Sequence, residues 1–448
     1  MAAPSDIALA VVGTAYHAPT RDRLEVVDGV IAVAAGGEIL GVEAAGSPAA
    51  DAAIDAAGDV VRLAPSQRLL PGFVDLHIHA PQWPQLGTGL DLPLERWLFE
   101  YTFPLEARYA DEAFAREVWG HMVPTLLAHG TTTAVYFATV HEAATLALAE
   151  ECVRQGQRAF VGRVAMDHPD GTPEWYRDAS ATEGIAASRR SVDAIRALGD
   201  PRVQPIVTPR FVPACTDELL AGLAGVAAET GALVQTHCSE SDWEHGHVLE
   251  RHGCSDTESL RRLGLLRVGT VLAHGNHLGD DDLVSIRTAG AGVAHCPMSN
   301  SYFANAVLPL RHLLDAGVRV GLGTDIAGGA EPALMRQCSH AVTVSRMLED
   351  GVDARRAAAE RGVPGSRIDA VTAFHVATAG GADVLGLPVG RFLPGCRFDA
   401  VVVDTAGGSA LRAWDGLDGH DRVLEKIVHV GSRADVVSVW VDGRRVLG

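Results

Sequence analysis

The sequence predicts an α/β protein: a (β/α)₈ TIM barrel with a small β-sandwich domain formed from both chain ends. The 448 residues are 47% hydrophobic, which is enough to bury a large core. In the middle of the chain, short apolar runs alternate with helix-compatible stretches of roughly 10–20 residues. The two ends instead contain short strand-like runs separated by turn residues.

The first strand-like runs lie in residues 1–70 and are IALAVVGTAY, VIAVAAGGEILGVEA and DVVRLAPSQRLL. The last lie in residues 386–448 and are FDAVVVD, EKIVHVG and DVVSVWVDGRRVL, with a hairpin turn at Asp442-Gly443. Because both ends share this pattern, we expect them to form one composite β domain. The start, MAAPSDIALAVVG, has no basic region and only a short apolar run. It predicts neither a signal peptide nor a membrane span, and hence a cytoplasmic protein.

Residues 71–385 contain eight apolar runs with helix-compatible sequence between them. Eight strand–helix units in succession favour a closed barrel over an open sheet, so we place the barrel in this range. The runs are GFVDLHIH, TTTAVYFAT, RAFVGRVAM, RVQPIVTPR, ALVQTHCSE, GTVLAHG, AGVAHCP and RVGLGTD.

Charge and composition exclude several classes of function. The formal net charge is −19, which repels phosphate backbones, so we expect no nucleic-acid partner. Lys426 is the only lysine, which excludes Schiff-base chemistry in the barrel and a phosphate-binding Walker lysine. The seven cysteines form no CxxC pair. They predict a reducing compartment and argue against a disulfide framework or a thiolate zinc site.

Polar residues stand at the ends of most of the apolar runs, and in a barrel these ends converge on one mouth. His77 and His79 are two apart on a strand, so both side chains point to the same side. An isolated pair of this kind is more often two polar residues at a strand end. His237 and Asp325, at the ends of two further runs, reverse that preference. Together the four offer a nitrogen and oxygen shell suited to zinc or iron(II).

Three residues are predicted to be catalytic: Glu240, His274 and Asp325. Glu240 lies three residues beyond His237, where a carboxylate can shuttle a proton between the attacking water and a substrate ring. Its alternative role is a solvated loop acid. His274 could bind the metal or orient the attacking water, and we prefer the second role because four ligands are already assigned. His295, beside Cys296, is read as a structural residue.

These residues also carry a family resemblance, which runs from about residue 65 to about residue 385. The matching segments are PGFVDLHIHAPQW, DLPLERWLFEYTFP, HGTTTAVYFAT, RAFVGRVAMD, PIVTPRF, THCSES, LAHGNHL, VAHCPMSN and GLGTDIAGG. Together they resemble the guanine deaminases of the amidohydrolase superfamily. HxH with a late GxGTD marks the superfamily broadly, whereas HAPQ, LPLxxWLxxYTFP and TPRF are more specific.

The resemblance implies hydrolysis of guanine to xanthine and ammonia, usually by a homodimer. It implies one zinc ion per subunit, with Glu240 as the acid and base. The barrel agrees with a single metal, because it lacks the lysine that commonly bridges two metals in binuclear relatives, and a bridging glutamate stays open as the alternative. The implied zinc ligands are His77, His79, His237 and Asp325, and the implied purine-binding residues are Gln82, Arg210 and Phe211.

Two departures from the family bear on the substrate pocket. After VAHCPMSN the chain reads SYFANAVLPL, residues 301–310, where many members have a small loop that contains glycine. Trp83 stands where tyrosine is frequent. Both could line the pocket, so we count Trp83 among the substrate-binding residues.

Guanine fits an arginine better than adenine does. The fork of Arg210 can donate two hydrogen bonds to O6 and N7 of guanine. Adenine carries an amino donor at that edge, which a guanidinium cannot accept. Gln82 could pair with the remaining amide edge, and Phe211 could stack on the ring. The alternative makes Arg210 a salt-bridge residue at the rim.

Two other functions are weighed against guanine deamination. A sister deaminase would act on another aminated heterocycle, such as 8-oxoguanine, a pterin or a triazine. A metal-free scaffold protein would be expected to lack one or more ligands, and here all four are present. The HxE and PCxxC signature of the other zinc deaminases is absent from the sequence.

Overall fold

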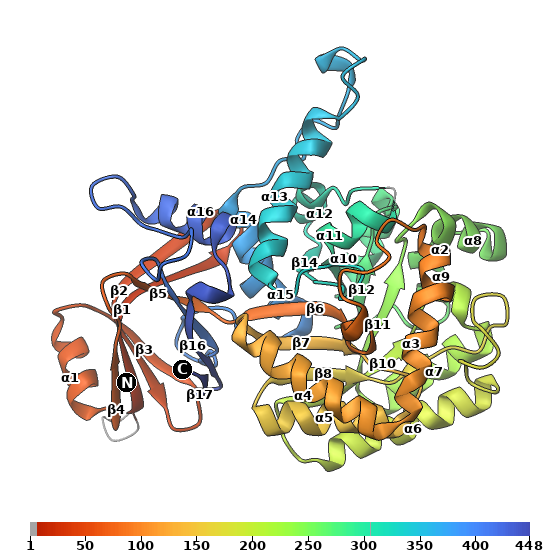
Figure 1. The fold of residues 1–448 in the computed structure, drawn as a ribbon, viewed down its shortest axis with the longest axis horizontal. Coiled ribbons are helices and arrows are strands. Elements are labelled where there is room, and N and C mark those ends of the chain that lie inside the picture. Colours follow the sequence, from red (N-terminus) through yellow and green to blue (C-terminus); the bar gives the residue numbers. More distant parts are fainter. Residues whose placement is uncertain (1–6, 305) are drawn as a thin grey trace.

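A computed structural model describes residues 7–304 and 306–448. All eight apolar runs of the middle region form strands, and these pair in parallel in chain order from β6 to β14. The short β9 (Val164–Ala165) continues the run of β8 and pairs with β10. The predicted barrel is therefore confirmed (Figure 1). Its strands are β6 (Phe73–His79), β7 (Thr131–Phe137), β8 (Arg158–Gly162), β10 (Val203–Pro209), β11 (Leu233–Cys238), β12 (Val271–His274), β13 (Gly292–His295) and β14 (Arg319–Leu322).

The ring of strands closes just beyond the end of β14. The amide of Asp325 donates to the carbonyl of His77 at 2.8 Å, and the amide of His79 donates to the carbonyl of Ile326 at 3.0 Å. These two hydrogen bonds fix the predicted HxH pair against the predicted carboxylate ligand.

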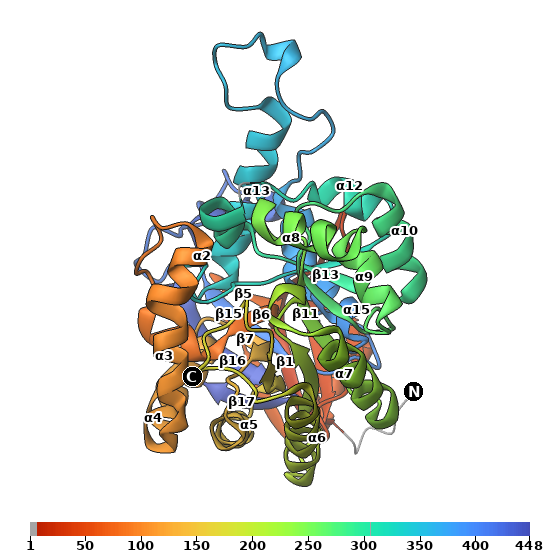
Figure 2. The ribbon, with the colours of Figure 1, turned by 90° about the vertical axis from the view of Figure 1, so that its right-hand side faces the viewer.

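Helices surround the strands (Figure 2). Several begin at a serine or threonine whose side chain accepts an amide of the first turn, as at Ser180, Thr216 and Ser241. Several end at a left-handed glycine, as at Gly156 and Gly231. The principal outer helices are α4 (Glu112–Ala128), α5 (Glu142–Gln155), α6 (Ala181–Ala197), α7 (Asp217–Thr230), α8 (Asp242–His252), α9 (Asp256–Arg262), α10 (Asp280–Ala289), α12 (Leu310–Asp315), α13 (Leu334–Asp350), α14 (Ala370–His375) and α15 (Gly381–Leu385).

The two chain ends form one separate β structure, as expected. The order of hydrogen-bonded strands in this sheet is β17-β16-β15-β5-β1-β2-β3. In it, β15 from the C-terminal end pairs antiparallel with β5 from the N-terminal end. The domain boundaries near residues 70 and 385 stay a prediction. The strands are β1 (Ile7–Thr20), β2 (Arg23–Ala34), β3 (Ile39–Ala44), β4 (Asp59–Arg62), β5 (Gln67–Pro71), β15 (Ala400–Asp404), β16 (Val436–Val441) and β17 (Arg444–Leu447).

The prediction of a strand at EKIVHVG, near the C-terminus, is wrong. EKIVHVG lies almost entirely in helix α16 (His420–Val430). Its buried residues recur with the helical period as Val423, Leu424, Ile427 and Val428, and they pack into the main core. The β-branched residues favour a strand locally, but the apolar stripe begins before the segment that we read and is helical.

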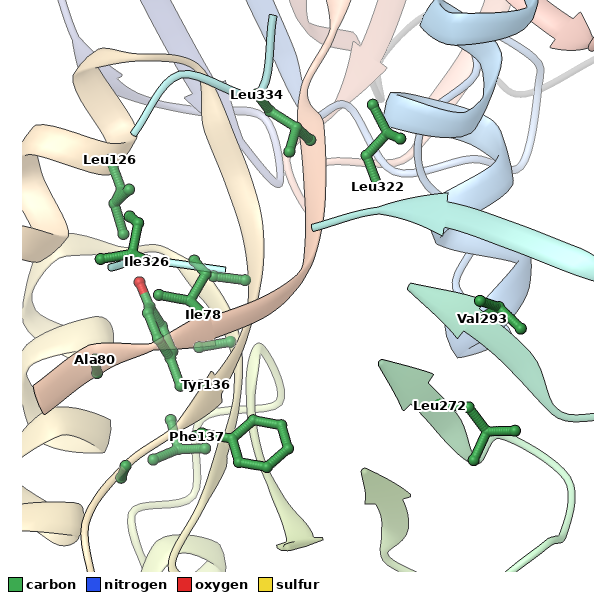
Figure 3. Packing of buried hydrophobic residues seen from close by; sticks show 14 of the residues in the cluster. Ile78, Ala80, Leu126, Tyr136, Phe137, Leu272, Val293, Leu322, Ile326 and Leu334 are labelled. Carbon is green, nitrogen blue, oxygen red and sulfur yellow. The ribbon is translucent and has the colours of Figure 1, made fainter. Parts of the chain in front are cut away.

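The two faces of β6 carry different kinds of side chain: one packs in the hydrophobic core and the other carries the candidate ligands. All seven of its residues are buried. Ile78 packs in a cluster with Tyr136, Ile326 and Leu126 of α4 (Figure 3). Because side chains alternate along a strand, His77 and His79 face the other way.

A buried ion pair joins the barrel to the terminal sheet. Arg158 at the start of β8 donates from Nε and Nη2 to the two carboxylate oxygens of Asp399, each at 3.1 Å. The amide of Asp442 also donates to Asp399, at 2.7 Å. The terminal sheet thus contacts the end of β8 opposite to the mouth and leaves the mouth clear.

The sequence predicts no signal peptide at the N-terminus and no membrane span. Residues 1–6, which belong to the segment read as lacking a signal, lie outside the described part. Across residues 7–304 and 306–448, the helices are all too short or too polar to cross a membrane. All seven cysteines are free thiols.

Candidate active site

The four predicted metal ligands meet at the mouth of the barrel. His77 Nε2 lies 3.1 Å and His79 Nε2 lies 3.5 Å from Oδ1 of Asp325. His79 Nε2 lies 2.9 Å from His237 Nε2. Ligand atoms on one tetrahedral zinc ion, with bonds of about 2.0–2.2 Å, are about 3.4 Å apart. The separations therefore suit donors that share one small cation.

The protonation of these histidines also suits a metal. His237 Nδ1 is 2.6 Å from the carbonyl oxygen of Arg210, which can only accept, so Nδ1 holds the proton and Nε2 has a free lone pair. Burial lowers the pKa of His77, His79 and His237 well below the usual value, which favours the neutral, ligating form. Both ring nitrogens of His77 are buried without a hydrogen-bond partner within the described ranges. The donor set fits a divalent ion that prefers nitrogen and oxygen.

Glu240 and His274 complete the cluster. Nε2 of His274 lies 3.7 Å from Oε1 of Glu240 and 3.9 Å from Oδ2 of Asp325. Burial and the charge of Asp325 raise the pKa of Glu240 to about 8. Glu240 is thus a carboxyl that can gain or lose a proton near neutral pH, which a proton shuttle requires.

Asparagines that the sequence reading missed fix the ring of His274. Asn276 Nδ2 donates to the carbonyl of Glu240 at 2.8 Å, and Asn300 Nδ2 donates to Asn276 Oδ1 at 2.8 Å. Asn300 Oδ1 must then accept from His274 Nδ1, 2.9 Å away. A neutral His274 therefore presents an unprotonated Nε2 to the site. Both asparagines stand in the segments LAHGNHL and VAHCPMSN, in which only the histidines are considered as site residues above.

Backbone strain is concentrated at the same strand ends. Ser239, His274 and Asp325 have φ values of 53°, 74° and 50°, in the left-handed region that such residues seldom adopt. They follow or end β11, β12 and β14. Strain of this kind persists where the surrounding structure holds functional groups in place.

A cavity with about 410 Å³ of empty space adjoins the cluster. Phe303, from the divergent segment 301–310, faces Trp97 across a ring distance of 5.1 Å; residue 305 of that segment is outside the described part. The cavity is lined by His79, Gln82, Leu94, Trp97, Leu98, Arg210, Phe211, His237, Glu240, Ser299, Phe303, Asp325 and Gly328.

The structure brings Gln82, Arg210 and Phe211 into this cavity but not Trp83. The indole of Trp83 instead donates to Nδ1 of His121 at 2.9 Å, outside the cavity lining. Gln82 and Trp83 are neighbours in a 3₁₀ helix, η2 (Ala80–Gln85), in which successive side chains are about 120° apart. Only one of them can face the substrate.

Arg210 already has a partner. Its Nη1 and Nη2 lie 2.6 Å and 3.2 Å from the two carboxylate oxygens of Glu106, a buried residue of α3 (Phe103–Ala107). Neither the free purine-reading fork nor the rim salt bridge describes this arrangement, because the ion pair is buried in the cavity wall. Glu106 lies two residues beyond the motif YTFP, and the sequence pattern does not reveal it as a partner of Arg210.

Comparison with known proteins gives consistent matches. The Amidohydrolase family matches residues 68–446. The guanine deaminase of Dictyostelium discoideum is 36% identical over 383 residues, covering 84% of this chain and 82% of the relative. The human guanine deaminase is 35% identical over 397 residues, covering 87% and 85%.

Solved structures show the same likeness. The guanine deaminase from C. acetobutylicum with bound guanine has a TM-score of 0.86 and 27% identity, covering 97% of this chain and 99% of that one. The E. coli guanine deaminase gives 0.85 and 27%, covering 97% and 98%. A triazine hydrolase from Arthobacter aurescens, at 19% identity and a TM-score of 0.81, shares the fold.

Proposed function

Because the chain belongs to the amidohydrolase family, we propose that it hydrolyses guanine to xanthine and ammonia with one zinc ion per subunit. The observation that carries this proposal is the cavity itself. It joins the His and Asp cluster and Glu240 to a wall of Gln82, Arg210 and Phe211. Relatives that are about 35% identical over most of their length are guanine deaminases.

The proposed zinc ligands are His77, His79, His237 and Asp325. When bound, the zinc ion would activate water as the nucleophile at neutral pH. His274 is placed to accept a hydrogen bond from the attacking water at Nε2, because its Nδ1 proton is engaged by Asn300. This supports the role of an orienting residue, although Nε2 also lies close enough to His77 and His237 to share an ion with them.

Glu240 moves the protons. Its carboxylate takes one proton from the water as the oxygen attacks C2 of the base, and it delivers this proton to a ring nitrogen. It then takes the second proton from the hydroxyl now on C2 and passes it to the departing amine. The C2–N bond breaks and ammonia leaves. A raised pKa makes the protonated form of Glu240 accessible for this second half of the reaction.

The base is oriented by the cavity wall. A guanidinium has five N–H donors, and two of those on Arg210 are engaged by Glu106, so three remain for O6 and N7. Phe211 offers an apolar ring, and its centroid is 6.0 Å from that of the His237 ring. Adenine would present a donor to donors, so guanine should be preferred.

The first test is the conversion of guanine to xanthine, followed by absorbance. Activity should disappear after treatment with a chelator and return with zinc. Iron(II) serves as the parallel addition. Ammonia release from adenine, 8-oxoguanine, a pterin and a triazine gives the substrate preference. A higher kcat/KM for another base than for guanine would show that guanine is not the preferred substrate. Full activity in metal-free protein would contradict the proposed role of a metal ion.

Assembly and location complete the proposal. We expect a homodimer acting in purine breakdown, as the family resemblance implies, and a cytoplasmic location, as the start of the sequence predicts. The end of α13 and residues 351–367 project from the body in both views (Figures 1 and 2). Light scattering of the purified protein gives the mass directly, and a monomer of 47.1 kDa would contradict the dimer.

A further inference from the structure

We propose that Glu106 is a positioning residue for base recognition. It neutralises Arg210 and fixes the directions in which Arg210 and Gln82 present their donors to the base. The inference rests on the proposed function, because it concerns how the same cavity reads its substrate.

Glu106 lies behind the cavity wall. It is fully buried, and it is not one of the residues that line the cavity, whereas Arg210 and Gln82 are. Glu106 therefore acts through its neighbours and does not touch the base.

Both oxygens of the Glu106 carboxylate are engaged. Oε2 accepts from Arg210 Nη1 at 2.6 Å, and Oε1 accepts from Arg210 Nη2 at 3.2 Å and from Gln82 Nε2 at 3.0 Å. Such a bidentate pair holds a guanidinium in one plane. One buried carboxylate thus fixes two recognition residues that are 128 positions apart in the chain.

The amide of Gln82 has only one possible orientation. Its Oε1 accepts from the amide of Ala327 at 3.1 Å, and its Nε2 donates to Glu106. A flipped amide would face a carboxylate with an oxygen and a backbone N–H with an NH₂ group. Gln82 therefore keeps one free N–H and one free lone pair in fixed places.

Charge gives a second reason for the pair. Guanine is neutral, so it cannot compensate a lone guanidinium buried next to the metal cluster. With Glu106 present, the pair is neutral and Arg210 acts through directed N–H donors. The face of Phe103, 5.0 Å from the guanidinium carbon, covers another side of Arg210. A base with acceptors on one edge is then favoured over a base that merely carries negative charge.

The test is a double-mutant cycle in the zinc-loaded enzyme: Glu106→Gln, Arg210→Met and the two combined. Each variant is assayed for guanine kcat/KM and for the inhibition constant of 2-aminopurine, which is guanine without the 6-oxygen. Glu106→Gln should lower guanine kcat/KM by at least about tenfold, mainly through KM, as expected for one lost specific contact. The 2-aminopurine constant should change less than the guanine value, because this base keeps the N7 acceptor but lacks O6. The combined variant should be no worse than Arg210→Met alone.

Controls separate recognition from folding. Glu112→Gln, on the exposed surface of the next helix, should leave all constants unchanged. Glu106→Gln leaves Arg210 unpaired, and this variant could unfold for that reason. The combined variant, which removes both charges, is then compared with Arg210→Met alone. Glu106→Asp provides another arm, because it keeps the charge but shortens the reach, and it should raise the guanine KM without loss of zinc.

Two failures are distinguishable. If wild type releases no ammonia from guanine, the proposed function is wrong, and the same cycle is then measured on the base that wild type does deaminate. If wild type is active but Glu106→Asp and the folded Glu106→Gln keep the wild-type guanine KM, Glu106 does not position the base. Equal losses for guanine and 2-aminopurine, or additive effects in the combined variant, also overturn the inference.

Discussion

Glu240 illustrates how its surroundings suit a single carboxyl to the role proposed for it. It is buried, its backbone amide donates to Glu244 Oε2 at 2.7 Å, and its carbonyl accepts from Asn276 at 2.8 Å. The backbone is thus held on both sides while the carboxyl faces the cavity. Position and a pKa near 8 together suit proton transfer.

Replacing Glu240 by glutamine should leave zinc content unchanged and lower kcat by about 10²–10⁴-fold. Glutamine keeps the size and hydrogen bonding but cannot carry a proton. Zinc is measured by atomic emission and kcat by guanine turnover. Glu250→Gln, on the exposed side of α8, is the control. A loss below about tenfold would remove Glu240 from the role of acid and base.

His237→Ala should abolish bound zinc and activity together, because the remaining donors no longer surround the ion. His312→Ala, an exposed histidine paired with Asp280, is the control and should keep both. The metal content of the two purified variants is measured to test this prediction. Full zinc occupancy in His237→Ala would show that the ligand set is different.

The site residues that sequence could predict are those whose places follow from strand periodicity. His77 and His79 follow from a spacing of two, and His237 and Asp325 follow from strand ends that converge. Glu106 could not be predicted in this way, because its partner Arg210 is 104 residues away and neither stands in a periodic pattern with the other. Trp83 was misplaced because a 3₁₀ turn rotates it away from its neighbour Gln82.

Among the elements, β14 and β6 are in unusually close contact. A Cβ added to Gly323, just after β14, would lie 2.8 Å from Cβ of His77 and 2.9 Å from Sγ of Cys296. Such distances require the strands to move. Only glycine lets the final turn of the barrel lie against β6, the first strand with proposed metal ligands.

Gly323→Ala should therefore weaken zinc binding by about 10–100-fold, the effect typical of lost outer contacts at a metal site. Zinc affinity is obtained by titration with a competing chelator. Gly120→Ala in α4 provides a matched control, because its Cβ would meet open space and helix propensity should raise stability by about 0.5–1 kcal/mol. Wild-type zinc affinity in Gly323→Ala would contradict this account.

Element type was predictable where periodicity was unbroken. The eight barrel runs are continuous apolar segments, typical of buried parallel strands. The error at EKIVHVG arose because the segment is short and β-branched. The helical period becomes visible only when Val423 and Leu424, which precede the segment, are included.

At the scale of the molecule, the buried pair of Arg158 and Asp399 connects barrel and terminal sheet. Both side chains are largely shielded from solvent, with side-chain exposures of 10% and 1%. Removing one partner leaves the other charge buried and unpaired. Composition at the chain ends predicts that they belong together, but a contact between residues 241 apart is set by the assembled fold.

Arg158→Met should lower the free energy of unfolding by about 3–5 kcal/mol, because Asp399 remains buried without its cation. Arg154→Met is the control. Arg154 is exposed and pairs with Glu151, so it should cost less than about 1 kcal/mol. Urea unfolding monitored by circular dichroism compares the two, and equal midpoints would show that the interface does not depend on the pair.

The pairing of β5 with β15 also dictates an order of events at the ribosome. Pro71 of β5 and Ala400 of β15 are partners, so one edge of β5 stays open while the whole barrel is synthesised. At the usual 5–20 residues per second, that interval is roughly 16–66 seconds. Throughout it, the nascent chain exposes an unpaired strand edge next to apolar residues, which invites association with other chains. We therefore expect nascent chains to need protection by a chaperone until the last fifty residues emerge.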